Sequence, residues 1–188
     1  MTQQALTSDE VVLREIEAEA EKQYLPIIGP AKGKYLAEEV CKTRPMRVLE
    51  VGTLIGYSTI LMGREMVEGS EIISIEIHSD EAELAMQNIM RADIPAKVRV
   101  QTGNALDIIL TLQGPFDFAF IDAEKTEYFR YLKLMEPMLH GGTVVFADNA
   151  GMFREQMRDY LNYVRGSGNY RSRYIQVEDD GVEISVKL

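Results

Sequence analysis

Tryptophan is absent from the sequence, cysteine occurs once and histidine twice, at Cys41, His78 and His140. A single cysteine excludes a disulfide within the chain and any zinc site built from several cysteines. We expect Cys41 to be a small residue on a helix and both histidines to be exposed to solvent. No run of about 18 apolar residues occurs. The N-terminal segment MTQQALTSDE also lacks the basic and apolar regions of a signal peptide, so we expect a soluble cytoplasmic protein that does not enter a membrane.

Basic residues are scarce too. The 20 lysines and arginines face 30 aspartates and glutamates, which gives a formal net charge of −10. This charge opposes binding to nucleic acid unless basic residues cluster, and it favours a small-molecule partner. Five arginines of the C-terminal part could form such a cluster: Arg154, Arg158, Arg165, Arg171 and Arg173.

The 188 residues, of which 46% are hydrophobic, suit one domain with a sizeable core. No repeat, low-complexity tract or long linker interrupts the chain. We therefore predict a single domain over residues 1–188, in which residues 1–45 are a helical cover and residues 46–188 a catalytic sheet. The sequence leaves the oligomeric state open, a homodimer included.

The segment RVLEVGTLIGYS at residues 47–58 predicts a strand, a glycine turn and the start of a helix. The turn runs from Gly52 to Gly56, and the helical pattern opens at Tyr57-Ser58. Glycines let the backbone turn sharply and let a ligand approach, and the free N–H groups of a helix start attract an anion. The spacing G-x-x-x-G lacks the middle glycine of the dinucleotide fingerprint. We therefore expect a ligand site that differs from a dinucleotide site.

A second apolar run, EIISIEI, ends in Glu76, which lies 24 residues after Gly52. A carboxylate at the end of the second strand of a βαβ unit can accept both hydroxyls of a ribose. A solvated strand end is the simpler explanation. However, a charged residue at the end of an otherwise apolar run favours the role of Glu76 as a ribose ligand.

Strand and helix patterns alternate along the chain. The expected helices cover residues 8–24, 31–41, 57–69, 79–91, 126–139 and 152–165, with a short one after Ala105. The expected strands cover residues 48–51, 71–77, 97–101, 116–122, 143–147, 170–177 and 182–188. This pattern predicts an α/β fold with a mostly parallel, Rossmann-like sheet, helices on both faces and the first two helices over the ligand site. The turn at residues 179–181 predicts a C-terminal antiparallel hairpin, which is the ending of the class I methyltransferase variant of this sheet.

Polar side chains close the predicted strands. Ligands of open α/β sheets bind beyond the carboxyl ends of the strands, so these residues are candidates for the site. They are Glu76, Asn104, Asp122, Asp148 and Asn149. Asp122, Asp148 and Asn149 offer the hard oxygen ligands that suit Mg²⁺. Each alone would be an ordinary helix cap.

Lys125 lies three residues beyond Asp122. A lysine beside a divalent cation and a sulfonium would have a lowered pKa and could accept a proton. The simpler alternative is a surface lysine that pairs with Glu124 or Glu127.

Seven segments resemble the catechol O-methyltransferase-type family of S-adenosylmethionine-dependent O-methyltransferases. They extend from about residue 28 to the C-terminal part of the chain. The segments are IGPAKGKY (28–35), VLEVGTLIGYS (48–58), SIEIH (74–78), GNALDII (103–109), FDFAFIDAEK (116–125), GGTVVFADN (141–149) and YVRGS (163–167). Together they are specific, although each alone is not.

The resemblance implies S-adenosylmethionine and Mg²⁺, or another divalent cation, as cofactors. It implies cofactor contacts at Ile28, Gly52, Gly56, Tyr57, Ser58, Glu76, Ile77, Asn104, Ala105 and Asp122. Among these, Ile28 and Ser58 would hold the methionine carboxylate end of the cofactor, and Glu76 would bind its ribose. The adenine would be lined by Ile77, Asn104 and Ala105. It implies Asp122, Asp148 and Asn149 as metal ligands. Lys125 would take the proton of the acceptor hydroxyl.

The chain departs from the catechol enzymes of this family at two points. Those enzymes flank the acceptor ring with tryptophans, whereas here Glu124 stands where one of them would. The segment between Tyr174 and Asp180 is several residues shorter, and the glutamate that orients the second catechol hydroxyl has no counterpart in register, Glu178 being nearest. The resemblance therefore implies methyl transfer to a hydroxyl of a small acceptor, a phenol or a vicinal diol, without fixing catechol.

Two other functions stay open at this point. Some relatives methylate a hydroxylated tRNA base, for which the five C-terminal arginines could provide the binding patch. A protein of another class, either an NAD-dependent oxidoreductase or a nucleotide-binding module without chemistry, would use the same glycine turn. Separate titrations with S-adenosylmethionine and NAD distinguish these alternatives.

Overall fold

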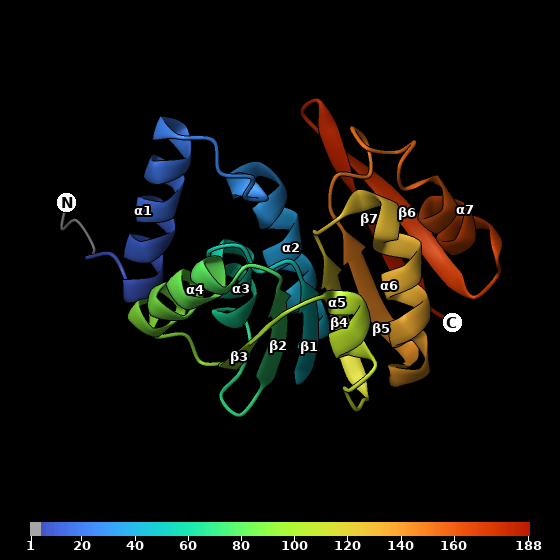
Figure 1. The fold of residues 1–188 in the computed structure, drawn as a ribbon, viewed down its shortest axis with the longest axis horizontal. Coiled ribbons are helices and arrows are strands. Elements are labelled where there is room, and N and C mark those ends of the chain that lie inside the picture. The colour runs from blue at the N-terminus through green and yellow to red at the C-terminus, as the bar shows by residue number, and fades with distance from the viewer. Residues whose placement is uncertain (1–4) are drawn as a thin grey trace.

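A seven-stranded sheet forms the centre of the computed structural model, which describes residues 5–188 (Figure 1). The strands are β1 Arg47–Val51, β2 Glu71–Glu76, β3 Lys97–Thr102, β4 Phe116–Ile121, β5 Leu139–Ala147, β6 Tyr170–Val177 and β7 Asp180–Lys187. They lie in the order β3-β2-β1-β4-β5-β7-β6. The first five run parallel, and β7 pairs antiparallel with β5 and β6.

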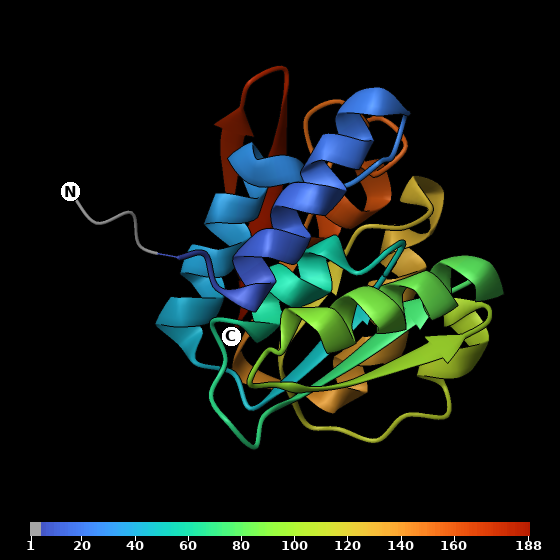
Figure 2. The ribbon, with the colours of Figure 1, turned by 90° about the vertical axis from the view of Figure 1, so that its left-hand side faces the viewer.

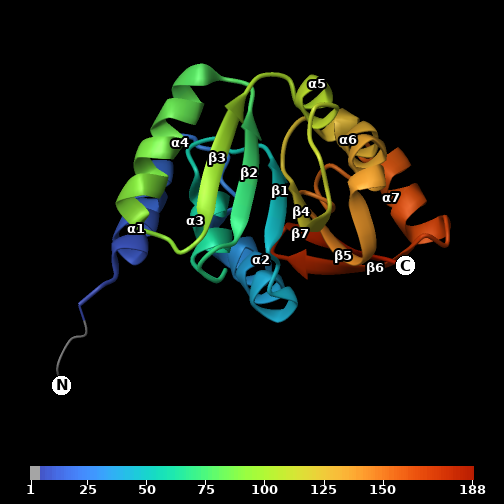
Figure 3. The ribbon, with the colours of Figure 1, turned by 90° about the horizontal axis from the view of Figure 1, so that it is seen from below.

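Helices cover both faces of this sheet (Figure 3). The α-helices are α1 Ser8–Lys22, α2 Gly29–Thr43, α3 Tyr57–Gly63, α4 Ser79–Ala92, α5 Ala105–Ile109, α6 Tyr128–Met135 and α7 Arg158–Gly166. Two 3-10 turns, η1 Lys125–Glu127 and η2 Glu136–Met138, flank α6. The first four helices pack on one face, and α5, α6 and α7 on the other. The predicted fold class is confirmed: a mostly parallel sheet with helices on both faces and a C-terminal hairpin.

Alternate side chains of the strands hold the two helix layers. In β4, Phe118 and Phe120 belong to the core under α1 to α4, whereas Ala119 and Ile121 belong to the core under α5 to α7. All four are fully buried, and burial of each large apolar side chain contributes about 1.5–3 kcal/mol. A strand covered on both faces is held firmly in place, so the core fixes the residue that follows β4, Asp122.

Two helices are shorter than predicted. The helix predicted over residues 57–69 ends at Gly63, because the amides after Arg64 bond only three residues back, as Glu65 N does to Met62 O at 3.1 Å. The helix predicted over residues 126–139 is α6 with a 3-10 turn at each end, and Pro137 lies in the second turn. Since proline has no N–H to continue an α-helix, the chain tightens there and enters β5 at Leu139, before the predicted Thr143.

The bounds of α2 and α7 also differ from the prediction. α2 begins at Gly29 instead of Ala31, with Pro30 in its first turn. The first turn of a helix does not need that N–H, so Pro30 starts the helix and does not break it. The helix predicted from Met152 begins only at Arg158, because residues 151–157 form turns.

The first two helices have different positions. α1 lies across α3 and α4 (Figure 2). α2 and the loop before it lie beside the carboxyl ends of the strands (Figure 1). The expectation that both helices cover the ligand site stays a prediction for α1. No helix among residues 5–188 combines the length and the apolar character needed to cross a bilayer.

Candidate functional site

The glycine turn brings the ends of β1 and β4 into contact. Gly52 has φ +99°, and a Cβ placed on it would lie 2.0 Å from the carbonyl oxygen of Asp122. Only glycine fits there. Gly56 has φ +88° and packs against the backbone of α4 at Ala85. Gly52 therefore lies at the floor of the site, whereas Gly56 supports the turn from behind.

Glu76 is tied to the same turn. Its carboxylate accepts hydrogen bonds from Leu54 N at 2.7 Å and from His78 N at 3.0 Å, and its side chain is buried. The two backbone donors leave further lone pairs on both oxygens. The geometry is therefore compatible with the predicted acceptance of two hydroxyl groups.

A cavity of about 520 Å³ opens in front of Gly52 and Glu76, which is within the usual size range of small-molecule sites. Nine of the ten predicted cofactor residues line it: Ile28, Gly52, Tyr57, Ser58, Glu76, Ile77, Asn104, Ala105 and Asp122. Asn104 also caps α5, because its side chain accepts from Leu106 N at 2.8 Å. Gly56 is the predicted residue that does not line the cavity.

A buried carboxylate that the sequence analysis did not identify lies beneath the turn. Glu50 is fully buried, and its oxygens accept hydrogen bonds from Ser58, Thr59 and Ser74 at 2.5–2.6 Å. Burial raises the pKa of Glu50 to about 7, against the opposite effect of the three hydroxyls. The hydroxyl of Ser58 is therefore engaged by Glu50, although Ser58 also borders the cavity. The charge inside the apolar run VLEV was the signal for this residue.

Beside this cavity the structure brings together the three predicted metal ligands. Asp122 follows β4, and Asp148 and Asn149 follow β5. Asp148 is 1% exposed, and its pKa rises to about 7 because it is buried and next to Asp122. Asn149 has φ +63° and donates from its side-chain nitrogen to Asp180 at 2.9 Å. That bond leaves the amide oxygen of Asn149 available as a ligand.

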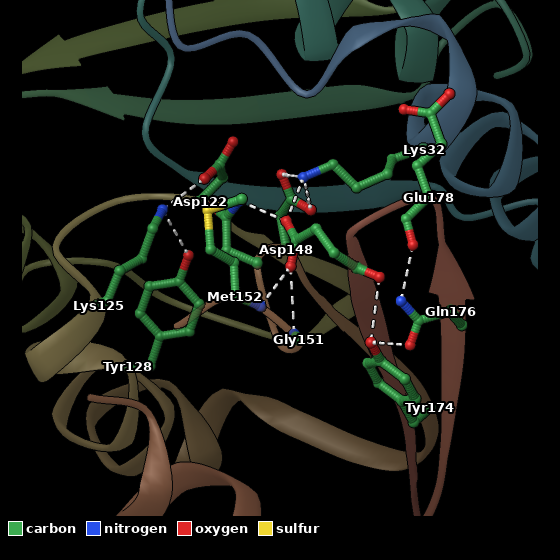
Figure 4. A network of polar contacts seen from close by, with 12 residues as sticks. Lys32, Asp122, Lys125, Tyr128, Asp148, Gly151, Met152, Tyr174, Gln176 and Glu178 are labelled. Carbon is green, nitrogen blue, oxygen red and sulfur yellow. Dashed lines mark hydrogen bonds and ion pairs between the residues drawn. The ribbon is translucent and has the colours of Figure 1, made fainter. Parts of the chain in front are cut away.

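Two charged residues that the sequence analysis missed, Lys32 and Asp180, complete this group, and Figure 4 shows Lys32 beside Asp148. The ammonium group of Lys32, from α2, lies 2.7 Å and 2.8 Å from the two oxygens of Asp148 and 2.9 Å from Asp180. Burial lowers the pKa of Lys32, but the two aspartates outweigh this effect and raise it. The pKa of Asp180 falls to about 2: burial alone would raise it, but the Met152 amide, Lys32 and Asn149 stabilise the charged form.

The sequence signals of these two residues were ambiguous. Lys32 lies within the segment IGPAKGKY, and Asp180 within a hairpin turn, where aspartate is common. Their contact spans 148 positions of the chain. Only the packing of α2 against the hairpin brings them together.

The donor set fits a hard divalent cation. Asp122, Asp148 and Asn149 supply two carboxylates and an amide oxygen, the ligands that Mg²⁺ prefers. Oδ1 of Asp148 is buried and receives no well-directed hydrogen bond from the described residues, although Lys32 lies close to it. A second acidic group, Glu76, His78 and Glu81, has ligand atoms within 4.8 Å of one another. Glu76 and Glu81 of that group line the first cavity, and the group is not the predicted metal site.

Lys125 contacts Asp122 and not the two glutamates of the simpler alternative. Its ammonium group lies 2.8 Å from Asp122 Oδ1 and 3.2 Å from the hydroxyl of Tyr128 (Figure 4). Glu124 instead caps η1 through Thr126, and Glu127 binds Arg130 and Tyr131. The half-buried Lys125 is therefore not a surface lysine paired with Glu124 or Glu127.

A second cavity of about 630 Å³ lies on the other side of Asp122 and Lys125. Tyr24, the first turn of α2, the metal-ligand candidates, Met152, Phe153 and the hairpin turn at residues 177–180 line it. Both cavities share Ile28, Asp122 and Lys125. The arrangement can hold two small molecules next to each other, with a lysine and an oxygen-rich site where they meet.

His78 and His140 are exposed and Cys41 lies on α2, as predicted; Cys41 is also exposed. Of the five C-terminal arginines, three form ion pairs with carboxylates, and Arg154 pairs with Glu155 at 3.6 Å. Arg165 pairs with Glu183 at 2.6 Å, and Arg173 with Glu39 at 2.6 Å. The five therefore do not form a free basic patch.

Comparison with known proteins gives a consistent result. Residues 3–164 match the family model of O-methyltransferases. The catechol O-methyltransferase B of Danio rerio is 37% identical over 174 residues, 86% of this chain and 65% of the relative. The catechol O-methyltransferase of Niastella koreensis is 40% identical over 132 residues, 65% of this chain and 57% of the relative. The chain thus spans less than two thirds of the length of these two relatives. A crystal structure of an O-methyltransferase from Bacillus cereus in complex with SAH is similar with a TM-score of 0.85 and 28% identity, over 95% of this chain and 91% of that one.

Proposed function

This chain belongs to the O-methyltransferase family, and on that premise we propose that it transfers a methyl group from S-adenosylmethionine to a hydroxyl of a small acceptor. The catechol O-methyltransferase relatives confirm the resemblance found in the sequence. The observation that carries the proposal is the pair of cavities that meet at Asp122 and Lys125. A methyl transfer needs a donor and an acceptor held side by side.

The first cavity is the proposed cofactor site. S-adenosylmethionine is supported as cofactor by the related Bacillus cereus structure, which contains SAH. In this assignment Glu76 accepts the ribose hydroxyls, and Ile77, Asn104 and Ala105 border the adenine. The turn at Gly52 and the first turns of α2 and α3, with Ile28, Tyr57 and Ser58, receive the methionine end.

The group of Asp122, Asp148 and Asn149 is the proposed divalent-cation site. When bound there, the cation would hold the acceptor hydroxyl and favour its ionised form. Lys125 lies between the two cavities and takes the hydroxyl proton on its Nζ atom. It must be neutral to do so. Tyr128 stays protonated, because burial and Asp122 raise its pKa, and its hydroxyl holds the amine of Lys125.

The reaction then balances as an in-line displacement. The acceptor oxygen forms a bond to the methyl carbon, the bond from that carbon to sulfur breaks, and the electron pair stays on sulfur. The products are the methyl ether and S-adenosylhomocysteine, with the proton on Lys125. The chain contributes chiefly by positioning the two partners, which can supply several kcal/mol of a barrier.

The second cavity is the proposed acceptor site. Its wall offers Tyr24, Met152 and Phe153, and the side chain of Tyr24 is largely exposed. Aromatic and sulfur-containing side chains suit a flat ring. A phenol or vicinal diol is therefore the proposed acceptor class, with catechol included although tryptophan is absent.

An acceptor screen tests this proposal. Labelled S-adenosylmethionine is incubated with catechol, with a phenol that has one hydroxyl, and with tRNA, each with and without Mg²⁺. Label in catechol or the phenol supports the small-molecule acceptor, whereas label in tRNA alone would overturn it. Calorimetric titration with S-adenosylmethionine and with NAD decides the cofactor, and heat from NAD alone would reject a methyltransferase.

A further inference from the structure

Lys32 makes the closest charged contact of the proposed metal site. Its ammonium group approaches both oxygens of Asp148, at 2.7 Å and 2.8 Å. The side chain of Asp148 is 2% exposed and that of Lys32 is 14% exposed, so water screens the pair weakly. No other lysine or arginine among residues 5–188 forms an ion pair with Asp148. Lys32 therefore occupies the coordination space of this carboxylate more than any other side chain does.

Lys32 also acts on a second metal ligand through Asp180. It lies 2.9 Å from Oδ2 of Asp180, and the same oxygen accepts from the amide nitrogen of Asn149 at 2.9 Å. The other oxygen of Asp180 accepts from the backbone N–H groups of Gly151 and Met152. Asp180 is thus fixed by four donors. It holds Lys32 on one side and sets the orientation of Asn149 on the other.

The charges of this group determine how strongly it binds a cation. The three aspartates Asp122, Asp148 and Asp180 are faced by the ammonium groups of Lys32 and Lys125. We propose that Lys32 is a positioning residue that opposes the divalent cation at Asp148 and thereby sets the affinity of the metal site. The inference rests on the metal site proposed above and concerns the strength of that site.

The direction of the effect follows from electrostatics. A cation that binds Asp148 must share an oxygen with the ammonium group or displace it, and two positive charges a few ångströms apart repel each other. Without Lys32 both oxygens of Asp148 are free and the group carries one more net negative charge. Metal affinity should therefore rise. A lysine that served only to anchor α2 would have the opposite effect, because its loss would loosen the ligands.

The test is calorimetric titration of wild type, Lys32→Met and Lys34→Met with Mg²⁺ alone. Methionine keeps the apolar stem of lysine without its charge. Lys34 lies on the same helix, with an exposed side chain 3.9 Å from Glu38, so Lys34→Met removes the same charge away from the site. The titrations are made at about pH 8.5, where protons compete less for the carboxylates. Thermal unfolding of each variant is recorded, and Lys32→Gln replaces Lys32→Met if the latter does not fold.

We expect Lys32→Met to bind Mg²⁺ at least about tenfold more tightly than wild type, and Lys34→Met to match wild type. Tighter binding by Lys32→Met also supports the inference when wild type binds too weakly to measure. If wild type binds Mg²⁺ and Lys32→Met binds equally or less well, Lys32 only anchors α2 and the metal site stands. If neither protein binds Mg²⁺, both the metal site and the role of Lys32 are rejected.

Discussion

Gly52 and Asp122 meet so closely that a methyl group on the first would lie 2.0 Å from the carbonyl oxygen of the second. This contact joins the glycine turn to the loop that carries the proposed metal ligand and base. Asp122, at one side of this contact, borders both the proposed cofactor cavity and the proposed acceptor cavity.

Gly52→Ala should break this contact. The added Cβ meets backbone, which cannot move aside as a flexible side chain can, and φ +99° is strained for alanine. We expect a loss of more than about 2 kcal/mol in the free energy of unfolding and no measurable binding of S-adenosylmethionine. Gly69→Ala is the matched control, because Gly69 has φ +90° with nothing within 4 Å of its Cβ position. Equal losses in urea unfolding of both variants would show that strain, and not the contact, matters.

Glu76→Ala should weaken the binding of S-adenosylmethionine by roughly 1.5–3 kcal/mol, the range for hydrogen bonds to a charged group. Part of the loss would come from the amide of Leu54, which then lacks its acceptor. Calorimetry measures the affinity, and circular dichroism checks the fold. Glu81→Ala, a half-buried neighbour that also borders the cavity, serves as comparison. Unchanged affinity of Glu76→Ala would remove this residue from the cofactor site.

Asp148→Ala should abolish the dependence on divalent cations and most activity, with the binding of S-adenosylmethionine retained. The proposed metal contacts the acceptor and not the sulfonium, so the cofactor cavity should stay intact. Methyl transfer and cofactor affinity are measured in parallel, with the exposed Asp159→Ala as control. Full turnover of chelator-treated wild type would reject the proposed metal site at Asp122, Asp148 and Asn149.

Lys125→Met should lower kcat by about 10²–10⁴, as expected for lost acid–base catalysis, with cofactor affinity nearly unchanged. Raising the pH should partly restore the rate, because solvent hydroxide can remove the hydroxyl proton instead. The control is Lys133→Met, an exposed lysine bound to Glu136. A profile of kcat against pH that is the same in wild type and Lys125→Met would exclude the lysine as base and leave the methyltransferase proposal intact.

Glu50 should make the protein less stable as pH rises. Its folded-state pKa is about 7 and its ordinary value 4.5, so the folded protein holds a proton that the unfolded chain releases in between. Stability is therefore greatest below the ordinary pKa and falls by up to about 3 kcal/mol as the pH passes through 7. Urea unfolding at about pH 5 and about pH 8 should show a smaller difference for Glu50→Gln than for wild type. Asp148, whose pKa is also raised, is common to both proteins and cancels.

The sequence predicted the sheet and its hairpin well, because these depend on local patterns. Strand runs, glycine turns and the residues that end strands are readable without the fold, and nine of the ten predicted cofactor residues line one cavity. The sequence did not show that Gly56 lies behind the turn and outside the cavity, because its neighbour Ala85 belongs to another helix. The single-domain organisation, a cytoplasmic location and a homodimer stay predictions.

Long-range ionic contacts were not predictable in the same way. Lys32 finds Asp148 and Asp180 across more than a hundred positions of the chain, and no spacing rule links them. The partner of Lys125 was missed for a different reason. Asp122, Glu124 and Glu127 all lie near it in sequence, and the 3-10 turn η1 decides which carboxylate it meets.

The strand order leaves β3 and β6 as the two open edges of the sheet. Each edge exposes basic side chains at alternate positions, Lys97 and Arg99 on β3 and Arg171 and Arg173 on β6. An identical edge that approached to pair its backbone would bring like charges together, and natural sheets resist aggregation in this way. Arg99 and Arg173 are already paired with Glu71 and Glu39, so Lys97 and Arg171 are the two of these four described residues whose charge is left to oppose edge-to-edge pairing.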